Sequence, residues 1–445
     1  MVGSARGLRR TFQALGTRNY RLFFVGQVVS VTGTWMQKVA QDWLILELGG
    51  GPLELSIGVA LQQLPTLLLG MWGGLLVDRG SARKLLLATQ VLLACLALAL
   101  GLLAVGGLAS LPVVYAMALA VGCLSVVDTP ARQAFVVDMV GPEQAANAVS
   151  LNSSINNSAK LVGPAVAGSL IALTSTGVAF LINAATFVAI VVALLRMDPD
   201  SLHPRPPVAR GRGQVLEGLR YAWTQPMLRT PLEATLLVSM FSQNWRVTLP
   251  PLAVRVFGGG PSSYGLLLSA LGVGALVGAL LCAYLARPTL GLMEVQAVVL
   301  GLLMLSVALA PTYVALVAIM VGVGAGNTSF NTTSNAFVLL RSSPGMRGRV
   351  MSLRTLVSNG STPIGSVTIG WICQAASPRV GLGVGGGVAL LTAALLLRAR
   401  WRRPSGEPDG VQGRVTGPDG LQGPAAGPDG LQGPAAGPDG LQGPP

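Results

Sequence analysis

The sequence predicts an all-α membrane protein with twelve transmembrane helices in two pseudo-symmetric six-helix bundles. Three observations lead to this fold class. The chain of 445 residues is 51% hydrophobic and only 11% charged, whereas soluble proteins are about a quarter charged. Long apolar runs alternate with short polar segments along most of the chain, and short sequence patterns recur in its two halves.

A transmembrane helix needs about 20 mostly apolar residues to cross a hydrocarbon core of about 30 Å. The first candidate is much longer than a signal-peptide core and no cleavage site follows it, so we expect it to be retained. Twelve segments meet the length requirement. In chain order they are 20–48, 53–77, 84–107, 110–131, 147–172, 175–196, 229–256, 262–286, 289–309, 312–339, 349–376 and 379–400.

The positive charges predict how these helices thread through the membrane. With the N-terminus inside, 25 of the 30 lysines and arginines fall in inside segments and two, Arg255 and Arg379, fall outside. The other three, Lys38, Lys160 and Arg246, lie within spans. This asymmetry predicts a multi-pass protein of the inner (plasma) membrane with both termini in the cytoplasm.

An internal repeat indicates that the two halves share one plan. Ala134-Phe135-Val136 recurs 202 residues later as Ala336-Phe337-Val338, and Trp35 with the Gly-Gly-Gly-Pro run at 49–52 recurs as Trp245 with the run at 258–261. We therefore expect two bundles repeated in parallel, with a substrate site between them. The expected domains are a tail over 1–19, bundles over 20–196 and 229–401, a cytoplasmic linker over 197–228, and a tail over 402–445.

Two segments outside the bundles have their own patterns. The linker is rich in Pro and Arg and contains an amphipathic stretch over 214–223 that fits a membrane surface. The last segment repeats Gly-Pro-Asp-Gly-Leu-Gln-Gly-Pro with a period of ten residues. Collagen requires glycine at every third position, so the repeat predicts a disordered cytoplasmic tail and no triple helix.

Cysteine and histidine usage argues against an enzyme or a metalloprotein. The four cysteines lie in four different spans and His203 is the single histidine, so zinc-site spacing and a Ser-His-Asp triad lack their parts. The net charge of +13 is spread between spans and does not form the basic face of a nucleic-acid binder. We expect no metal, cofactor or nucleic-acid partner.

The segment 74–84 resembles the signature of the major facilitator transporters, G-x-x-x-D-R-x-G-R-R/K. Ser81 and Ala82 replace the usual glycine and first arginine. The resemblance implies that this segment holds the two bundles together on the cytoplasmic side. The gate residues that it implies, with one arginine after the fourth span, are Gly74, Asp78, Arg79, Arg83, Lys84 and Arg132.

Longer stretches resemble the secretion-effector branch of that superfamily, which includes enterobactin exporters. They begin at Asn19, at Asp128 and at Asn157, and the likeness covers nearly the whole chain except the tail. Gly163-Pro164-x-x-Ala167-Gly168 resembles the fifth-span motif of antiporters, with Ala167 in place of a glycine. Small residues at this spacing also serve helix packing alone. The mid-span arginine of the fourth helix in many drug antiporters is missing.

Polar side chains within the spans predict the lining of a central cavity, because a charge at the bilayer centre costs about 2.5–3.5 kcal/mol on insertion scales. Lys160 lies well inside the fifth span, with two asparagines on the same face, and spans one, seven and ten carry similar stripes. The substrate-binding candidates are Gln27, Thr34, Lys38, Gln41, Asn152, Asn156, Lys160, Gln243, Arg246, Asn327 and Asn331.

The charged candidates keep two interpretations open. Lys160 and Arg246 fit either an anionic or acceptor-rich substrate or an internal ion pair or gating latch. The proton-coupling candidates are Asp42, Asp128 and Glu233. Asp42 alternatively serves only Lys38, four residues before it, while Asp128 and Glu233 alternatively lie solvated near the cytoplasmic face.

The residues and the resemblance together predict a monomeric secondary transporter that lies in the lipid bilayer and binds a small molecule and protons. We expect it to export a small amphiphilic metabolite or drug, such as a siderophore-like compound, by alternating access coupled to proton antiport. An importer or a lipid flippase of the same fold is an alternative. A transporter-like sensor or scaffold that moves nothing is another.

Overall fold

The computed structural model describes residues 12–203, 214–285, 288–343 and 345–402, which form helices and no strands. They belong to one compact unit, Met1–Glu407. The second unit, Pro408–Pro445, and with it the predicted repeat tail, lies outside the described residues. Most of the predicted N-terminal tail and residues 204–213 of the predicted linker also lie outside them.

Six long helices form the first bundle after a short 3-10 turn, η1 (Gln13–Gly16). They are α2 (Arg18–Glu47), α3 (Pro52–Arg79), α4 (Ala82–Val105), α5 (Leu111–Val140), α6 (Ala145–Leu173) and α7 (Thr176–Leu195). Their ends agree with the predicted spans within a few residues, except that α5 continues nine residues beyond the predicted end. The extension places Arg132 inside the helix.

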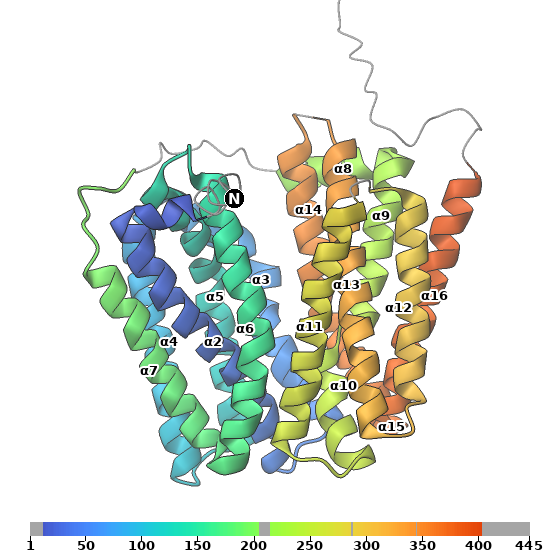
Figure 1. Ribbon diagram of the computed structural model, residues 1–445, viewed down its shortest axis with the longest axis horizontal. Helices are drawn as coiled ribbons and strands as arrows, with labels where there is room; N and C mark the ends of the chain where they lie inside the picture. Colours follow the sequence, from blue (N-terminus) through green and yellow to red (C-terminus); the bar gives the residue numbers. More distant parts are fainter. Residues whose placement is uncertain (1–11, 204–213, 286–287, 344, 403–445) are drawn as a thin grey trace, which may run out of the picture. The chain divides into compact units, whose positions relative to one another are not determined.

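The second bundle contains α11 (Pro261–Leu285), α12 (Leu290–Ala308), α13 (Tyr313–Arg341) and α16 (Pro378–Trp401) as continuous helices (Figure 1). The predicted seventh span is divided into α9 (Pro226–Leu237), η2 (Val238–Ser242), α10 (Trp245–Pro251) and η3 (Leu252–Val256). The predicted eleventh span is divided into α14 (Arg347–Gly360) and α15 (Thr362–Ala375).

The two broken spans have identifiable causes. The seventh contains Pro250 and Pro251, which lack backbone N–H donors, and both η2 and η3 are π-type turns. At the first break the side chain of Asn244 donates to the carbonyl of Met240 at 2.7 Å and so satisfies a released acceptor. The eleventh span breaks at Ser361, just before Pro363. Irregular backbone within a membrane bundle is typical of segments that face protein or a cavity.

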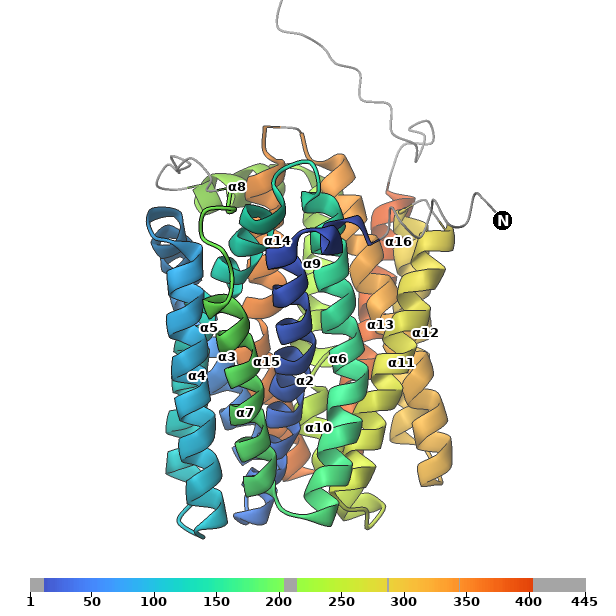
Figure 2. The ribbon, with the colours of Figure 1, turned by 60° about the vertical axis from the view of Figure 1, so that its left-hand side comes forward.

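The helices pair in the same way in both bundles, as the internal repeat predicts. α3 packs on α5 as α11 packs on α13, and α4 packs on α7 as α12 packs on α16. Between the bundles, α6 meets α11 and α3 meets α15 (Figures 1 and 2). The substrate site is therefore expected among α2, α6, the seventh span and α13, which carry the polar stripes.

Eight described helices are long and apolar enough to cross a membrane. They lie in α3, α4, α5, α7, α11, α12, α13 and α16. α2 and α6, of 30 and 29 residues, are long enough but carry the polar stripes that lower their hydropathy. The seventh and eleventh spans are divided into shorter helices. The all-helical membrane fold is confirmed, and the count of twelve spans stays a prediction for these four segments.

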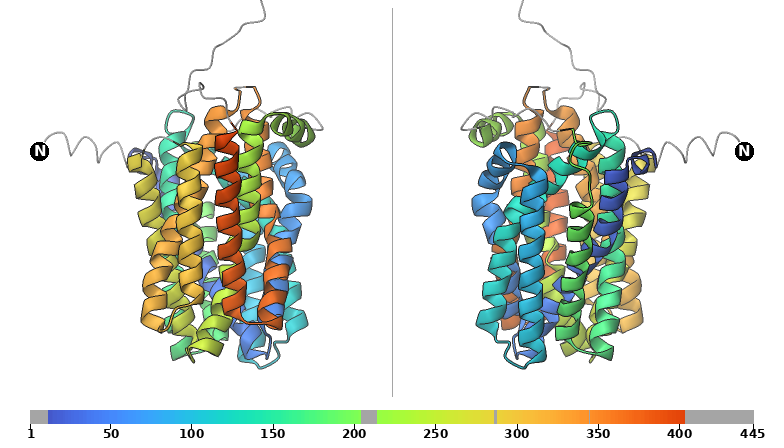
Figure 3. Two further views of the ribbon diagram at one scale, coloured as in Figure 1. Left: turned by 90° about the vertical axis from the view of Figure 1, so that its right-hand side faces the viewer. Right: turned by 90° about the vertical axis from the view of Figure 1, so that its left-hand side faces the viewer.

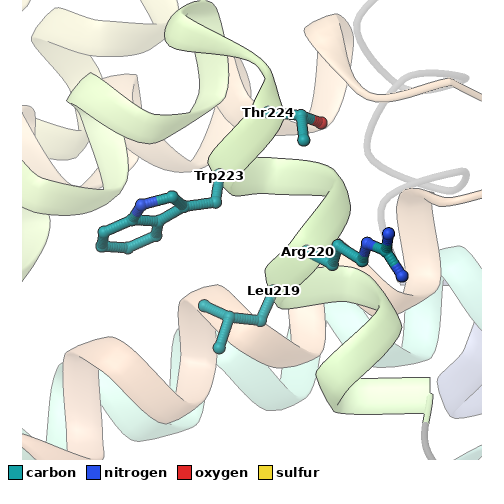
Figure 4. Close-up of a pocket in the computed structure, with 4 residues that line it drawn as sticks. All are labelled: Leu219, Arg220, Trp223 and Thr224. Carbon is teal, nitrogen blue, oxygen red and sulfur yellow. The ribbon is translucent and has the colours of Figure 1, made fainter.

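The predicted amphipathic stretch of the linker forms α8 (Gln214–Thr224), which lies across one end of the long helices (Figure 3). We call this the linker end and the opposite one the far end. Leu219 and Trp223 point to one side of α8 and Arg220 and Thr224 to the other, around a surface pocket (Figure 4). Trp223 is 56% exposed, while Ala222 is buried against α9, α13 and α14.

Candidate functional site

An ion pair joins the two bundles at Asp42 of α2 and Arg246 of α10. Arg246 donates from Nη2 to Oδ1 of Asp42 at 2.7 Å and from Nε to Oδ2 at 2.9 Å. Such a bidentate arginine–carboxylate pair is one of the stronger and more directional ion pairs found in proteins. Asp42 is only 1% exposed, so loss of either partner would leave a buried charge.

Two further side chains complete this contact. The hydroxyl of Tyr264, in the first turn of α11, donates to Oδ2 of Asp42 at 2.7 Å. The third guanidinium nitrogen of Arg246 donates to Gln62 of α3 at 2.7 Å. We call Asp42, Gln62, Arg246 and Tyr264 the interbundle network. The sequence predicted Asp42 and Arg246 as functional residues but missed Gln62 and Tyr264, whose only signal was a polar side chain within an apolar span.

The interbundle network lies toward the far end of the bundles. Asp42 is five residues before the last residue of α2, which is about 8 Å along a helix. Near it α3 and α15 approach closely, because a Cβ atom at Gly370 would lie 2.4 Å from Ser56. A Cβ atom at Gly51 would lie 2.6 Å from Gln374. The bundles are thus joined by charge and by close packing at the same end.

The second contact between the bundles, of α6 with α11, depends on the motif at 163–168. A Cβ atom at Gly168 would lie 2.7 Å from the carbonyl oxygen of Pro261, and one at Gly265 would lie 2.3 Å from that of Pro164. The hydroxyl of Ser269 also donates to the carbonyl of Leu161 at 2.8 Å. Gly163 faces α2 instead, where its Cβ would lie 2.6 Å from that of Trp35. The motif therefore sets two helix contacts, and its coupling role stays a prediction.

Lys38 does not provide the partner of Asp42 that the i,i+4 spacing predicted. The carboxylate instead accepts from Arg246 and Tyr264. The ammonium of Lys38 lies over the indole of Trp35, 4.0 Å from the ring centroid. That of Lys160 lies 5.8 Å from the same centroid. Two of the predicted substrate-binding residues are thus brought together at one aromatic ring, while Arg246 is used in the interbundle network.

A second buried network lies within the first bundle, around Asp128 of α5. Its Oδ1 accepts from Thr89 at 2.9 Å and from Gln90 at 2.6 Å, and its Oδ2 accepts from Arg132 at 2.7 Å. Arg132 also donates to Gln27 of α2. Asp128 is buried, so it is not the solvated carboxylate near a membrane face that one interpretation of the sequence described. Arg132, predicted in the cytoplasmic gate, bonds here within its own bundle.

The remaining predicted binding residues differ in accessibility. Gln27 and Gln41 are 0% and 2% exposed and so are out of a ligand's reach in this conformation. Six others are half-buried and stay predictions, most of them bonded along their own helix: Thr34 to Ser30, Asn156 to Asn152, Gln243 to Ser239, and Asn331 to Asn327.

Arg354 is a buried cation that the sequence analysis counted as a cytoplasmic charge. It lies in the second turn of α14 and is 9% exposed. Its Nη2 donates to the backbone carbonyl of Asn331 at 2.8 Å, and its Nε has no hydrogen-bond partner among the described residues. Arg354 therefore adds a positive charge beside the asparagine stripe of α13. Its burial could have been predicted from the helical spacing that places Arg354 on the same face as Val350 and Leu353, which are also buried.

The predicted cytoplasmic gate lies at the linker end. The helix α3 continues through Gly74 and Asp78 to Arg79, and α4 begins at Ala82, so only Gly80 and Ser81 connect them. Arg83 donates to the carbonyls of Leu194 and Met197, which belong to its own bundle. Arg79 and Lys84 are exposed. A gating role for this segment stays a prediction.

Glu233, the third predicted proton carrier, pairs with Arg229 at 2.6 Å in an exposed i,i+4 ion pair. Such exposed pairs contribute about 1 kcal/mol or less. Among the described residues no group of three histidine, cysteine, aspartate or glutamate side chains forms a potential metal site. The charged groups with the most specific geometry are therefore the interbundle network and the residues around Trp35 and Asp128.

Comparisons with known sequences agree with this architecture. Residues 10–416 match the model of the transmembrane secretion effector family. The uncharacterized MFS-type transporter YfiS of Bacillus subtilis is 28% identical over 240 residues, 53% of this chain and 56% of YfiS, so the match spans a little over half of that relative. The staphyloferrin A transporter of Staphylococcus aureus is 24% identical over 353 residues, 78% of this chain and 87% of that protein. The multidrug efflux pump Tap of Mycobacterium tuberculosis is 26% identical over 386 residues, with shares of 80% and 87%.

Solved structures show the same fold at low identity. The nucleoside transporter NupG superposes with a TM-score of 0.71 at 11% identity, over 86% of this chain and all of NupG (100%). A bacterial homologue of the human lysosomal transporter Spinster, crystallised in an inward-facing and unoccupied conformation, gives a TM-score of 0.64 at 14% identity, over 86% and 94% of the two chains.

Proposed function

Because the chain belongs to the transmembrane secretion effector family of major facilitator transporters, we propose that it exports a small amphiphilic metabolite or drug in exchange for protons. The molecule moved is of the size and polarity of a siderophore or an antibiotic. Relatives named as a siderophore transporter and as an efflux pump support this substrate class. The ion pair between Asp42 and Arg246 is the observation that best supports the proposed closure and proton coupling.

The orientation follows from the distribution of lysine and arginine. By sequence, 25 of the 30 lysines and arginines fall in the segments assigned to the inside, and this bias supports the linker end as the cytoplasmic end. The far end then faces the outside, and the interbundle network closes it. A state closed outside loads its substrate from the cytoplasm, between the polar stripes of the two bundles, as alternating access requires.

Asp42 couples this closure to proton movement. When the bundles separate at the far end, Arg246 leaves the carboxylate, which then meets the outside solution and takes up a proton. When the bundles close again, Arg246 displaces this proton, which leaves toward the cytoplasmic side. One proton thus enters for each outward delivery of substrate, and the proton gradient drives export.

The test is an untargeted comparison of metabolites inside and outside cells that express the wild type, Asp42→Asn or no transporter, at matched protein levels. A compound that accumulates outside only with the wild type supports export and identifies the substrate. Accumulation inside would instead support import, and a changed lipid distribution a flippase. No difference for any compound in several hosts would favour a sensor or scaffold and contradict the proposal.

Proton coupling has its own measurement. In everted membrane vesicles with an acidic lumen, uptake of the identified compound should consume the pH gradient, which a pH-sensitive dye reports. Asp42→Asn should abolish the dye response while Glu294→Gln, which breaks an exposed pair with Arg400 at 3.0 Å, should preserve it. A full dye response in Asp42→Asn would show that another group carries the proton, with Asp128 as the next candidate.

A further inference from the structure

Trp35 is the centre of a cluster with two positive charges. It lies on α2, one turn before Lys38, and Lys160 reaches the same ring from α6. The two ammonium groups lie 4.0 and 5.8 Å from the ring centroid. Both distances are within the about 6 Å over which a cation is attracted to an aromatic face.

The backbone of α6 holds this cluster in place. Gly163, one turn after Lys160, lies directly against Trp35, where a Cβ atom would approach to 2.6 Å of the Trp35 Cβ and 3.0 Å of the Thr32 carbonyl. Since no side chain separates the helices here, Lys160 is brought beside the ring. The close helix contact therefore fixes the backbone on which Lys160 stands, while the exposed Lys160 side chain is accessible to a ligand.

The positive charge of this cluster lacks a matching carboxylate. Within the described part of the chain, neither ammonium has a hydrogen-bond or ion-pair partner. Asp42, the acidic residue nearest in sequence to Lys38, is bound by Arg246 and Tyr264. Asp128 is bound by Arg132. Two charges of one sign within one membrane bundle are costly unless something compensates them.

We propose that Lys38, Trp35 and Lys160 bind the anionic part of the substrate, an organic anion that carries a carboxylate next to a flat apolar group. The two ammonium groups pair with the carboxylate, and the indole contacts the apolar group. The inference rests on the proposed transport function and narrows its substrate class. In this proposal Lys38, and not Arg246, is the second cation that binds the substrate together with Lys160, because Arg246 is bound to Asp42 in the interbundle network.

Binding can be tested without transport. The purified full chain in lipid nanodiscs is titrated with salicylate and with its neutral amide, salicylamide, while quenching of intrinsic tryptophan fluorescence is followed. We expect saturable quenching by salicylate, reduced about tenfold or more in affinity in Lys38→Gln/Lys160→Gln because two charge-assisted contacts are lost. Lys38→Arg/Lys160→Arg keeps both charges and should bind, and Trp35→Phe should lose most of the signal.

Three results would overturn the proposal: no saturable quenching of the wild type by salicylate, equal binding of salicylamide, or equal affinity in the double glutamine variant. Arg398→Gln, at an exposed position near the end of α16, is the matched control for loss of a positive charge. Size-exclusion elution and thermal unfolding verify that each variant is folded. If the double glutamine variant does not fold, the double arginine variant provides the test, because loss of salicylate binding in it would contradict a site that needs only the two positive charges.

The outcomes separate this site from the proposed function. Selective salicylate binding without any exported compound would support the anion site and contradict export. Export of a neutral or cationic compound that the double glutamine variant leaves unchanged would support export and contradict the anion site.

Discussion

Arg246 of α10 binds the carboxylate of Asp42 of α2 through two hydrogen bonds, of 2.7 and 2.9 Å, and so connects helices of different bundles. The two residues are 204 positions apart in the sequence. Because the carboxylate is buried and Tyr264 also donates to it, the contact is sensitive to small changes in either partner. The first two predictions follow from this sensitivity.

Asp42→Asn should open the far end. The amide cannot compensate the charge of Arg246, and removal of one partner of a buried ion pair costs about 3–5 kcal/mol. A reporter cysteine at Ser56, which is 0% exposed and packs against Gly370 of α15, measures opening through its reaction with a membrane-impermeant maleimide in a background without the four native cysteines. We expect the labelling rate to rise at least about tenfold. An unchanged rate, with Glu294→Gln as the control, would show that the ion pair does not hold the far end closed.

Tyr264→Phe should have a smaller effect in the same direction. It removes one hydrogen bond to a charged acceptor, worth about 1.5–3 kcal/mol, but keeps both contacts of Arg246 with Asp42. The labelling rate at the reporter should lie between those of the wild type and Asp42→Asn. If Tyr264→Phe labels as fast as Asp42→Asn, the hydroxyl and not the arginine controls the closed state.

Gly168→Val should separate α6 from α11 and lower both stability and transport. The first added carbon would lie 2.7 Å from the Pro261 carbonyl, and overpacking of a close contact typically costs about 1–3 kcal/mol. Gly383→Val is the matched control, since nothing lies within 4 Å of a Cβ atom there. Thermal unfolding in detergent measures the stability of both variants. Equal unfolding temperatures would mean that the helices re-pack at no cost.

Asp128→Asn should destabilise the first bundle without changing accessibility at the far end. The carboxylate accepts hydrogen bonds from Thr89, Gln90 and Arg132, and loss of its charge leaves Arg132 with the neutral amide of Gln27 as its other described side-chain partner. We expect a loss of about 1.5–3 kcal/mol, seen as a lower unfolding temperature with an unchanged maleimide rate at Ser56→Cys. A normal unfolding temperature together with a lost dye response in vesicles would instead identify Asp128 as a proton carrier.

Trp223 of α8 should lie in the headgroup region of the bilayer. Its ring is exposed, Leu219 points to the same side, and the guanidinium of Arg229 lies 4.8 Å from the ring centroid. Tryptophan favours this interface because its body is apolar and its N–H is polar. In nanodiscs with brominated lipid, a variant with Trp223 as its single tryptophan should be quenched. Quenching by aqueous iodide alone would place α8 in water.

The helices were largely predictable because hydrophobic length and the repeat depend on sequence alone. The breaks of the seventh span at Asn244 and of the eleventh at Ser361 were not predicted, although both fall in polar stretches, 242–246 and 358–363, because the apolar residues on either side were counted as one span. Pairing was harder to predict for a physical reason. Spacing along one helix indicated a Lys38–Asp42 pair, but the bundles bring Arg246 to Asp42 from another helix. Gln62, Tyr264 and Arg354 become visible only through such tertiary contacts.

The two seams between the bundles are chemically different. The contact of α6 with α11 is built from glycine backbone and from the neutral hydroxyl of Ser269, groups that keep the same charge over the physiological pH range. The other seam contains Asp42 and Arg246. Of these two seams, we therefore expect only the one with Asp42 and Arg246 to respond directly to a change in pH or ionic strength. Tyr264 of the interbundle network directly precedes Gly265 of the glycine contact on α11, so the proposed proton step at Asp42 would act one residue away from the contact about which the bundles would turn.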